Sequence, residues 1–326
     1  MRDVSRREAI RGFAGVAALG GFLSTAKFAG QAGQAAREVR GQGSASLLAG
    51  PPKPVCGTDY AANTWKTISA DTGGLAGFRA YAAPAAGIPA AWPGSVGVIP
   101  ATATLPVISI KPDIPTVLSG SLDAQLAAYF ALVSAGAWVT LWHEGDSAAN
   151  GFTTAQIIGL HSHVYPIFKA NAPATASYVQ ITTGYTGNPL SSHYPLSQWV
   201  CCPANGGPML DVYGMDSYAD VVADTASSIW NRTMFGLPGT HNGVASVAAG
   251  GQFAITETGI KSSLVAAGGE SRANWYNDSY AFAKANSMLA CFTYWDAPGS
   301  TSGYAWDATD TATIAALSAI NAASKS

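Results

Sequence analysis

The sequence is poor in charged residues. Only 11% of its 326 residues are Asp, Glu, Lys or Arg, and the formal net charge is −2. Nucleic acids and anionic membranes are bound through clusters of Lys and Arg, so neither is an expected partner. The chain is nonetheless 48% hydrophobic. That fraction is too high for a disordered protein and sufficient to bury a sizeable core.

Cysteine is scarce as well. The four cysteines, Cys56, Cys201, Cys202 and Cys291, show no C-x-x-C spacing, which disfavours a zinc site. We expect buried free thiols, with one disulfide as the alternative if the protein reaches an oxidising compartment. The sequence also has no G-x-S-x-G motif at a strand–helix turn, so serine-hydrolase chemistry has no support.

Glutamate is the less common of the two acids, and only five occur. Glu8 and Glu38 lie in the N-terminal region, and Glu270 opens a predicted helix, where an acid interacts favourably with the helix dipole. Glu144 and Glu257 remain, each at the far end of an apolar segment, where an unpaired carboxylate is unfavourable. We therefore interpret these two glutamates as a catalytic pair.

The N-terminal segment is typical of an export signal. Two adjacent arginines, Arg6 and Arg7, come shortly before an apolar run of small residues over 12–23. The run is too short and too rich in Gly and Ala for a stable membrane span. We expect residues 1–30 to be a twin-arginine signal peptide, so that the protein is secreted and leaves the membrane once the signal is removed. Residues 31–52 are rich in Gly, Ala, Gln and Ser and are predicted to be a flexible linker.

Short apolar segments alternate with helical patterns over residues 53–326, which is typical of parallel α/β proteins. The predicted strands are eight segments, 55–60, 77–82, 105–112, 138–144, 176–185, 210–218, 253–257 and 288–296. The clearest helical patterns lie at 122–134, 154–170, 272–286 and 308–323, with a weak one at 226–232. Eight strand–helix units in a region of this length predict a single (β/α)8 TIM barrel as the catalytic domain.

Polar and aromatic residues follow these strands where each strand ends. In (β/α)8 barrels the active site lies at the carboxyl ends of the strands. Glu144 and Glu257 end the fourth and seventh predicted strands, so we expect their carboxyl groups to meet across the barrel mouth. Glycoside hydrolysis requires such a pair, and a separation of about 5 Å gives retention of configuration. Further candidates at these strand ends are Lys111, Asp146, Tyr185, Asp216, Tyr218, Trp295 and Asp296.

Two other side chains leave alternatives open. For Arg79, in the second strand, a hydrogen bond to the nucleophile and a structural ion pair are equally compatible with the sequence. A metal site formed by His143 with His161 or His163 is disfavoured, because the spacing is not that of a zinc motif. We expect His161 and His163 on the outer face of a helix. Strict alternation along the strand also points His143 away from an interior that Glu144 faces.

The glutamate pair resembles a known group of enzymes. Glutamate at the ends of the fourth and seventh strands is similar to the arrangement in clan A glycoside hydrolases, which are retaining (β/α)8 enzymes. The segment Trp142-His143-Glu144 resembles the version in glycoside hydrolase family 26, which contains β-mannanases. This resemblance implies that Glu144 is the acid/base and Glu257 the nucleophile.

The same resemblance implies roles for three further residues. Tyr218 resembles the sixth-strand tyrosine that hydrogen-bonds the nucleophile. Trp295 resembles the eighth-strand tryptophan that forms the floor under the cleaved sugar. By the same resemblance His143 contacts that sugar or steadies Glu144. The predicted substrate-binding residues are His143, Tyr218, Trp295, Trp142, Arg79, Lys111 and Asp216.

We therefore predict a secreted, retaining O-glycosyl hydrolase that cleaves a β-linked polysaccharide or oligosaccharide of the mannan, xylan or glucan type. We expect no cofactor, no bound metal and no partner besides the carbohydrate, and we expect a monomer. The alternative is a non-catalytic carbohydrate-binding or cell-wall protein on the same barrel, which needs no close pair of glutamates. A hydrolase that uses Asp216 and Asp296 is a third interpretation.

Overall fold

The structure is a computed structural model that describes residues 55–60, 70–81, 87–94, 99, 103–184, 198–237, 241–296 and 310–325. For residues 55–60, 237, 241–242, 295–296 and 325 it describes the backbone but not the side chains. The predicted signal peptide (1–30) and linker (31–52) lie outside the described residues. All the described residues belong to one structural unit. None of the described helices combines the length and the apolar character needed to cross a membrane.

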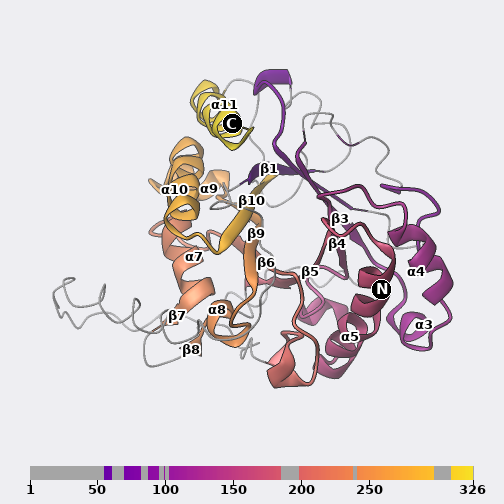
Figure 1. The fold of residues 1–326 in the computed structure, drawn as a ribbon. Coiled ribbons are helices and arrows are strands. Elements are labelled where there is room, and N and C mark those ends of the chain that lie inside the picture. Colours follow the sequence, from indigo (N-terminus) through magenta and orange to yellow (C-terminus); the bar gives the residue numbers. More distant parts are fainter. Residues whose placement is uncertain are drawn as a thin grey trace, which may run out of the picture. The chain divides into compact units, whose positions relative to one another are not determined.

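Within the described residues, eight parallel strands close into a barrel in the order β1-β10-β9-β6-β5-β4-β3-β2 (Figure 1). β1 pairs with both β2 and β10, which completes the ring. The predicted (β/α)8 class and its eight strands are thus confirmed. The strands are β1 (Val55–Tyr60), β2 (Gly77–Tyr81), β3 (Leu105–Ile110), β4 (Trp138–Leu141), β5 (Ser177–Thr183), β6 (Val212–Tyr218), β9 (Gln252–Gly259) and β10 (Leu289–Asp296). Two short strands, β7 (Gly236–Leu237) and β8 (His241–Asn242), form a separate antiparallel pair.

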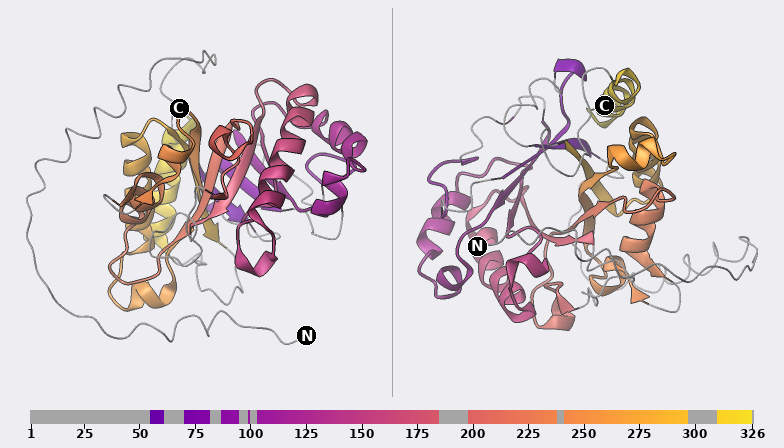
Figure 2. Two further views of the ribbon diagram at one scale, coloured as in Figure 1. Left: turned by 90° about the horizontal axis from the view of Figure 1, so that it is seen from below. Right: turned by 180° about the vertical axis from the view of Figure 1, so that it is seen from behind.

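Helices surround the strands on the outside (Figure 2). The longer ones are α4 (Asp123–Phe130), α5 (Thr154–Asn171), α7 (Ala226–Phe235), α10 (Arg272–Ala285) and α11 (Thr311–Lys325). Each overlaps a helical segment predicted from the sequence. The short helices α3 (Ile114–Leu118), α8 (Val244–Val247) and α9 (Ser262–Ala266) were not predicted, because five residues or fewer carry no periodic pattern.

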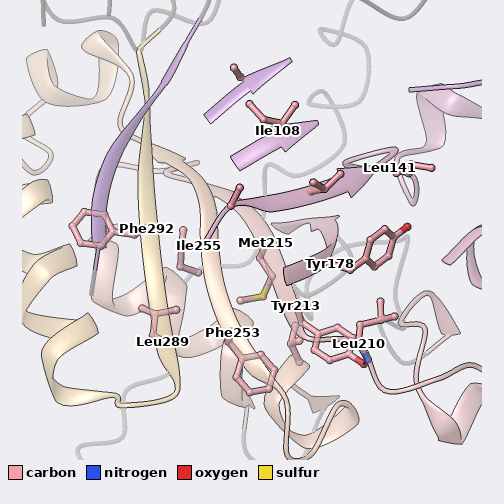
Figure 3. Packing of buried hydrophobic residues seen from close by; sticks show 14 of the residues in the cluster. Ile108, Leu141, Tyr178, Leu210, Tyr213, Met215, Phe253, Ile255, Leu289 and Phe292 are labelled. Carbon is pink, nitrogen blue, oxygen red and sulfur yellow. The ribbon is translucent and has the colours of Figure 1, made fainter. Parts of the chain in front are cut away.

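Two apolar layers hold the barrel together, one outside the strands and one inside. Outward-facing strand residues pack against the helices, and Figure 3 shows Ile108, Leu141, Met215, Phe253 and Phe292 among them. A smaller cluster that includes Val107, Trp138, Val179, Ile181, Val212 and Cys291 fills the inside. The described cysteine side chains, Cys201, Cys202 and Cys291, are buried free thiols as expected, while that of Cys56 lies outside the described residues.

Glu270 lies just before the helix that the sequence expected it to open, and its carboxylate accepts a hydrogen bond from a different helix. The N-cap of α10 is Ser271, which places Glu270 before the helix. Its Oε2 instead accepts a hydrogen bond of 3.3 Å from the amide of Ala226, the first residue of α7. Burial, reinforced by the nearby Asp278, raises the pKa of Glu270 to about 7.

Candidate active site

Charged and aromatic side chains from five places on the ring meet at the carboxyl ends of the strands. Arg79 and Tyr81 come from β2, Lys111 follows β3, His143 and Glu144 follow β4, Asp216 and Tyr218 come from β6, and Glu257 comes from β9. Residues two apart in a strand face the same side. Arg79 and Asp216 contact each other inside the barrel, so Tyr81 and Tyr218 face the interior as well.

Glu144 lies in a loop that leaves the barrel wall earlier than predicted. β4 ends at Leu141 rather than at residue 144, because Trp142 and Glu144 adopt left-handed backbone conformations (φ 54° and 53°). Non-glycine residues rarely adopt this region, and such strain is concentrated at functional sites. The amide of Glu144 still donates to the Ile181 carbonyl of β5 at 2.9 Å, and Asn150 Nδ2 donates to the Glu144 carbonyl at 2.7 Å. The backbone of Glu144 is therefore fixed on both sides.

A second buried carboxylate, Asp146, fastens the same loop to β5. Its Oδ1 accepts from the Thr183 amide at 2.9 Å, and its Oδ2 accepts from the Thr183 hydroxyl at 3.0 Å. Burial raises the pKa of Asp146 to about 7, and the Thr183 hydrogen bonds act in the opposite direction. Between the two acids, Gly145 has little room for a side chain, since a Cβ there would lie 2.6 Å from Ile157 Cδ1.

Glu257 faces the barrel interior because β9 contains a β-bulge. Alternation places Ala254 inside and Ile255 outside. The next two residues both face inward: the Thr256 hydroxyl donates to Asp216 Oδ1 at 2.7 Å, and Glu257 contacts Arg79. The pairing register of β9 shifts at this point relative to both β6 and β10. Bulges re-aim side chains in this way, and a regular strand would have turned Glu257 toward the helices.

Three carboxyl groups meet at the centre of the site. Glu144, Asp216 and Glu257 each offer an oxygen, and these oxygens all lie within 4.8 Å of one another. Two glutamates this close match the geometry of retaining glycosidases, in which the carboxyl groups are about 5–5.5 Å apart. The same three carboxyl groups could also offer ligands to a metal ion. Arg79 already places a positive charge between Asp216 and Glu257 and pairs with both.

Arg79 is fully buried and is the main partner of the acidic cluster. Its Nη1 lies 2.8 Å from Asp216 Oδ1 and 3.0 Å from Glu257 Oε1. It also donates to the Thr256 carbonyl at 2.7 Å. The sequence left two roles open for Arg79, a contact with the nucleophile and a structural ion pair. The structure shows both, because Arg79 contacts Glu257 and also forms an ion pair with Asp216. Burial raises the pKa of Asp216, while the Arg79 guanidinium acts against that rise.

Two tyrosines donate hydrogen bonds to Glu257, one to each carboxylate oxygen. Tyr218 OH donates to Oε2, and Tyr81 OH donates to Oε1 at 2.5 Å. Sequence reasoning named Tyr218 but missed Tyr81. The sequence did mark Tyr81, because it is the last residue of β2 and lies two positions after Arg79. Polar and aromatic residues at the carboxyl ends of the other strands were chosen as candidates, and Tyr81 occupies the same kind of position.

Lys111 and Trp142 lie together on the Glu144 side of the site. The Lys111 ammonium is 5.3 Å from the centroid of the Trp142 ring, and it forms no hydrogen bond or ion pair with any described residue. Burial lowers the pKa of Lys111, and the attraction of Glu144 opposes that change. The Trp142 indole donates to the Pro112 carbonyl and packs edge-on against Phe152 at 4.6 Å. The orientation of Trp142 is therefore fixed.

His143 faces the site, so the objection from strand alternation does not hold. Its ring meets that of Tyr81 edge-on, with 4.8 Å between the centroids. The left-handed residues on either side of His143 break the alternation, so neighbouring side chains can turn to the same side. Burial, with Arg79 and Lys111 nearby, holds the pKa of His143 well below its usual value, so the imidazole is neutral at pH 7. Its Nδ1 is buried without a hydrogen-bond partner in the described part of the chain.

The two helical histidines take no part in the site. His161 was predicted on the outer face of α5, and this is wrong: it is buried against β5, and its Nδ1 lies 3.0 Å from Tyr178 OH. Burial lowers the pKa of His161 to about 3. His163 is partly exposed and pairs with Asp123 of α4 at 2.7 Å. Among the described residues, the one group of three close potential metal ligands contains no histidine.

Two predicted residues are placed only by their backbone. Trp295 and Asp296 are the last residues of β10, and their side chains lie outside the described residues. Their strand ends next to β9 and β1 at the mouth of the barrel. The predicted floor under the sugar and the interpretation based on two aspartates therefore stay predictions.

The sequence matches no protein-family model and no curated protein. Its fold is similar to that of several solved glycoside hydrolases. One is a family 128 (subgroup II) endo-β-1,3-glucanase from Sorangium cellulosum, with a TM-score of 0.53 and 14% identity, covering 80% of this chain and 98% of that one. Another is a modular endo-β-1,4-mannanase of family 26 from Cellulomonas fimi, with a TM-score of 0.51 and 15% identity, covering 82% of this chain and 70% of that one.

A third similar structure is a family 39 glycoside hydrolase from Bacteroides cellulosilyticus WH2. Its TM-score is 0.52 at 12% identity, and the match covers 83% of this chain and 64% of that one. This chain thus spans less than two thirds of that protein. Because all these identities are low, the likeness concerns the fold. At that level these structures share with this chain the fold that the resemblance to clan A glycoside hydrolases implied.

Proposed function

We propose that this chain is a retaining glycoside hydrolase that cleaves a β-linked polysaccharide or oligosaccharide. Glu257 is the nucleophile and Glu144 the acid/base. The observation that carries the proposal is the close approach of the two carboxyl groups, within 4.8 Å, at the carboxyl end of a (β/α)8 barrel. A non-catalytic binding protein has no need for this proximity. The fold likeness to glycoside hydrolases supports the same class.

The reaction proceeds by two displacements at the anomeric carbon. In the first, a Glu257 oxygen bonds to that carbon while Glu144 gives its proton to the departing glycosidic oxygen. In the second, Glu144 removes a proton from water, the water oxygen bonds to the anomeric carbon, and the bond to Glu257 breaks. Arg79, Tyr81 and Tyr218 orient the Glu257 carboxylate for the first displacement.

The other site residues divide between substrate contact and support. Arg79 and Asp216 are buried and bonded to each other, so we assign them to the support of Glu257 rather than to contact with the sugar. Lys111 and Trp142 lie on the acid/base side, where the leaving part of the substrate sits. We assign His143 and Trp295 to the cleaved sugar. Mannans, xylans and glucans are the substrates to test, because the similar structures include a mannanase and a glucanase.

The experiment that tests this proposal is a glycan screen with matched glutamate variants. The wild-type protein should hydrolyse at least one of β-mannan, xylan, β-1,3-glucan or β-1,4-glucan, and NMR should show the β-anomer as the first product. Glu144→Ala and Glu257→Ala should keep the fold and lose turnover by orders of magnitude. Glu270→Gln is the control and should keep full activity. Full activity in either catalytic variant, or an α-anomer as first product, contradicts the assignment.

We also propose that residues 1–30 direct export and that the mature chain acts outside the cell as a monomer. The support is the pair Arg6-Arg7 shortly before the apolar run at 12–23. Replacing both arginines with lysine should retain a reporter fusion inside the cell, whereas the unchanged signal should export it. Equal export of both fusions contradicts the proposal.

A further inference from the structure

Tyr81 holds a position that connects both halves of the site. It ends β2, and its hydroxyl donates to Glu257 Oε1 at 2.5 Å. Its ring meets His143, the residue directly before Glu144, with 4.8 Å between the centroids. The guanidinium carbon of Arg79 lies 5.0 Å from the centroid of the same ring. One side chain therefore touches the nucleophile, its cationic partner and the segment that carries the acid/base.

The donors to Glu257 are divided unequally between its two oxygens. Oε1 receives Tyr81 and is 3.0 Å from the Arg79 guanidinium, whereas the donor to Oε2 is Tyr218. Both hydroxyls donate to the same charged carboxylate, so the difference between the two oxygens is the Arg79 cation, which makes Oε1 the more strongly held oxygen. Buried donors of this kind keep their position while charge moves in the reaction.

We infer that Tyr81 is a positioning residue for the nucleophile that selects Oε2 as the attacking oxygen. This inference rests on the proposed glycosidase function. When Oε2 bonds to the anomeric carbon, its lone pair is used, and the Tyr218 hydrogen bond to it is lost. Oε1 then becomes the carbonyl oxygen of the ester and can keep Tyr81 and Arg79.

The same arrangement assists the second displacement. As water attacks, the electron pair of the bond between Oε2 and the anomeric carbon returns to the carboxylate of Glu257. Negative charge therefore builds up on Oε1 as well as on Oε2. Tyr81 stabilises that charge from a position it already occupies, so no donor has to move at that moment. Loss of its hydroxyl should slow both the formation and the breakdown of the glycosyl-enzyme.

Two variants separate this role from simple packing. Tyr81→Phe keeps the ring that contacts His143 and removes only the hydroxyl. Tyr81→Leu removes the ring as well. If Tyr81 acts through its hydrogen bond, Tyr81→Phe should lower kcat/KM roughly 10- to 100-fold with little change in KM and in thermal stability. In Tyr81→Leu, kcat/KM should fall by no more than a further few-fold, and Tm should be lower than in the wild type.

The kinetic test uses the aryl β-glycoside of the sugar released in the glycan screen, with 2,4-dinitrophenol as leaving group. Breakdown of the glycosyl-enzyme limits turnover of such a substrate, so kcat there reports the second displacement, and Tyr81→Phe should lower it as well. A purely structural role predicts instead a lower Tm, with kcat/KM and this kcat both within about 2-fold of wild type. Activity of Tyr81→Phe within about 2-fold of wild type, alongside dead Glu144→Ala and Glu257→Ala variants, overturns the inference while the proposed function stands.

The choice of oxygen is tested in a trapped complex. The matching 2-deoxy-2-fluoroglycosyl fluoride forms a slow glycosyl-enzyme whose crystal structure identifies the bonded oxygen. We expect the sugar on Oε2, Tyr81 still within hydrogen-bond distance of Oε1, and Tyr218 displaced. A sugar on Oε1, with Tyr81 displaced instead, overturns the inference.

Discussion

The two glutamates of the site are held in opposite ways. Glu257 sits within a strand, and its carboxylate oxygens receive Arg79, Tyr81 and Tyr218. Glu144 sits in a loop beyond the end of β4, and it is fixed through its backbone, by the Ile181 carbonyl on one side and Asn150 on the other. The contacts that position the nucleophile thus include its charged end, and those that position the acid/base include the backbone that carries it.

This difference fits what each group has to do. A nucleophile must present one oxygen to a fixed point, so donors on its carboxylate give it orientation. An acid/base gains and loses a proton in each cycle, so its surroundings must accept both states. Fixing the loop through Asp146 and Thr183 places Glu144 without requiring one permanent charge on its carboxyl group.

The largest expected difference between the two glutamates is in chemical rescue. With a dinitrophenyl glycoside, whose leaving group needs no proton, azide should restore turnover in both Glu144→Ala and Glu257→Ala. In Glu144→Ala azide attacks the glycosyl-enzyme and gives the β-glycosyl azide. In Glu257→Ala azide replaces the nucleophile itself and gives the α-glycosyl azide. NMR of the products distinguishes them, and the same anomer from both variants would contradict the assigned roles.

Removal of the buried cation should have the next largest effect. Arg79→Met leaves Asp216 buried without its partner, which should lower the free energy of unfolding by about 3–5 kcal/mol in urea titrations. Lys169→Met is the matched control, because Lys169 pairs with Asp211 at 3.1 Å while 43% of its side chain is exposed. That variant should change stability by about 1 kcal/mol or less. Equal effects would show that Arg79 does not hold the nucleophile side together.

The loop that carries Glu144 should respond to pH through Asp146. Burial raises the pKa of Asp146 to about 7, above its value of about 3.9 in an unfolded chain. The stability linked to protonated Asp146 is therefore complete below about pH 4 and is lost as the pH rises through about 7. Between pH 5 and pH 8 the free energy of unfolding of the wild type should therefore fall by roughly 1–3 kcal/mol more than that of Asp146→Asn. Identical pH profiles for the two proteins would contradict this reasoning.

The smallest expected effect comes from changing Thr183, the residue that donates hydrogen bonds to Asp146. Thr183→Val removes the hydroxyl that donates to Asp146 at 3.0 Å and should lower stability by about 1 kcal/mol. Because the loop then holds Glu144 less firmly, kcat should fall by up to about tenfold with KM unchanged. Thr182→Val is the control, since that hydroxyl lies 3.5 Å from the Gly214 carbonyl of β6, whereas the Thr183 hydroxyl donates to Asp146 of the loop. A larger loss of activity in the control would break the link between Asp146 and Glu144.

The sequence predicted the strands and longer helices well, because each is marked by an apolar run or by helical periodicity. Its main candidates also come together in space: Glu144, Asp216 and Glu257 meet at the mouth of the barrel. That meeting follows from topology, since all strands run parallel and their carboxyl ends share one face. The assignment of roles within the group follows from contacts, which the sequence does not contain.

The errors arise where the backbone departs from regular geometry or where a side chain meets a distant partner. No pattern marks Trp142 and Glu144 as left-handed, so the end of β4 was placed three residues late. Glu270 accepts a hydrogen bond from the first residue of α7, a helix distant from it in sequence. His161 was placed outside because polar residues in helices are usually exposed, but a single hydroxyl on β5 accommodates it.

The bulge in β9 has a consequence for anyone who wishes to transplant this chemistry. A designer who copied the two glutamates onto an idealised barrel, with every strand in strict two-residue alternation, would place the second carboxylate among the helices. The resulting protein would fold, and it would be inert. The template to copy is therefore the strand with its extra residue, since one irregular step in the hydrogen-bond ladder decides whether the barrel interior receives its second acid.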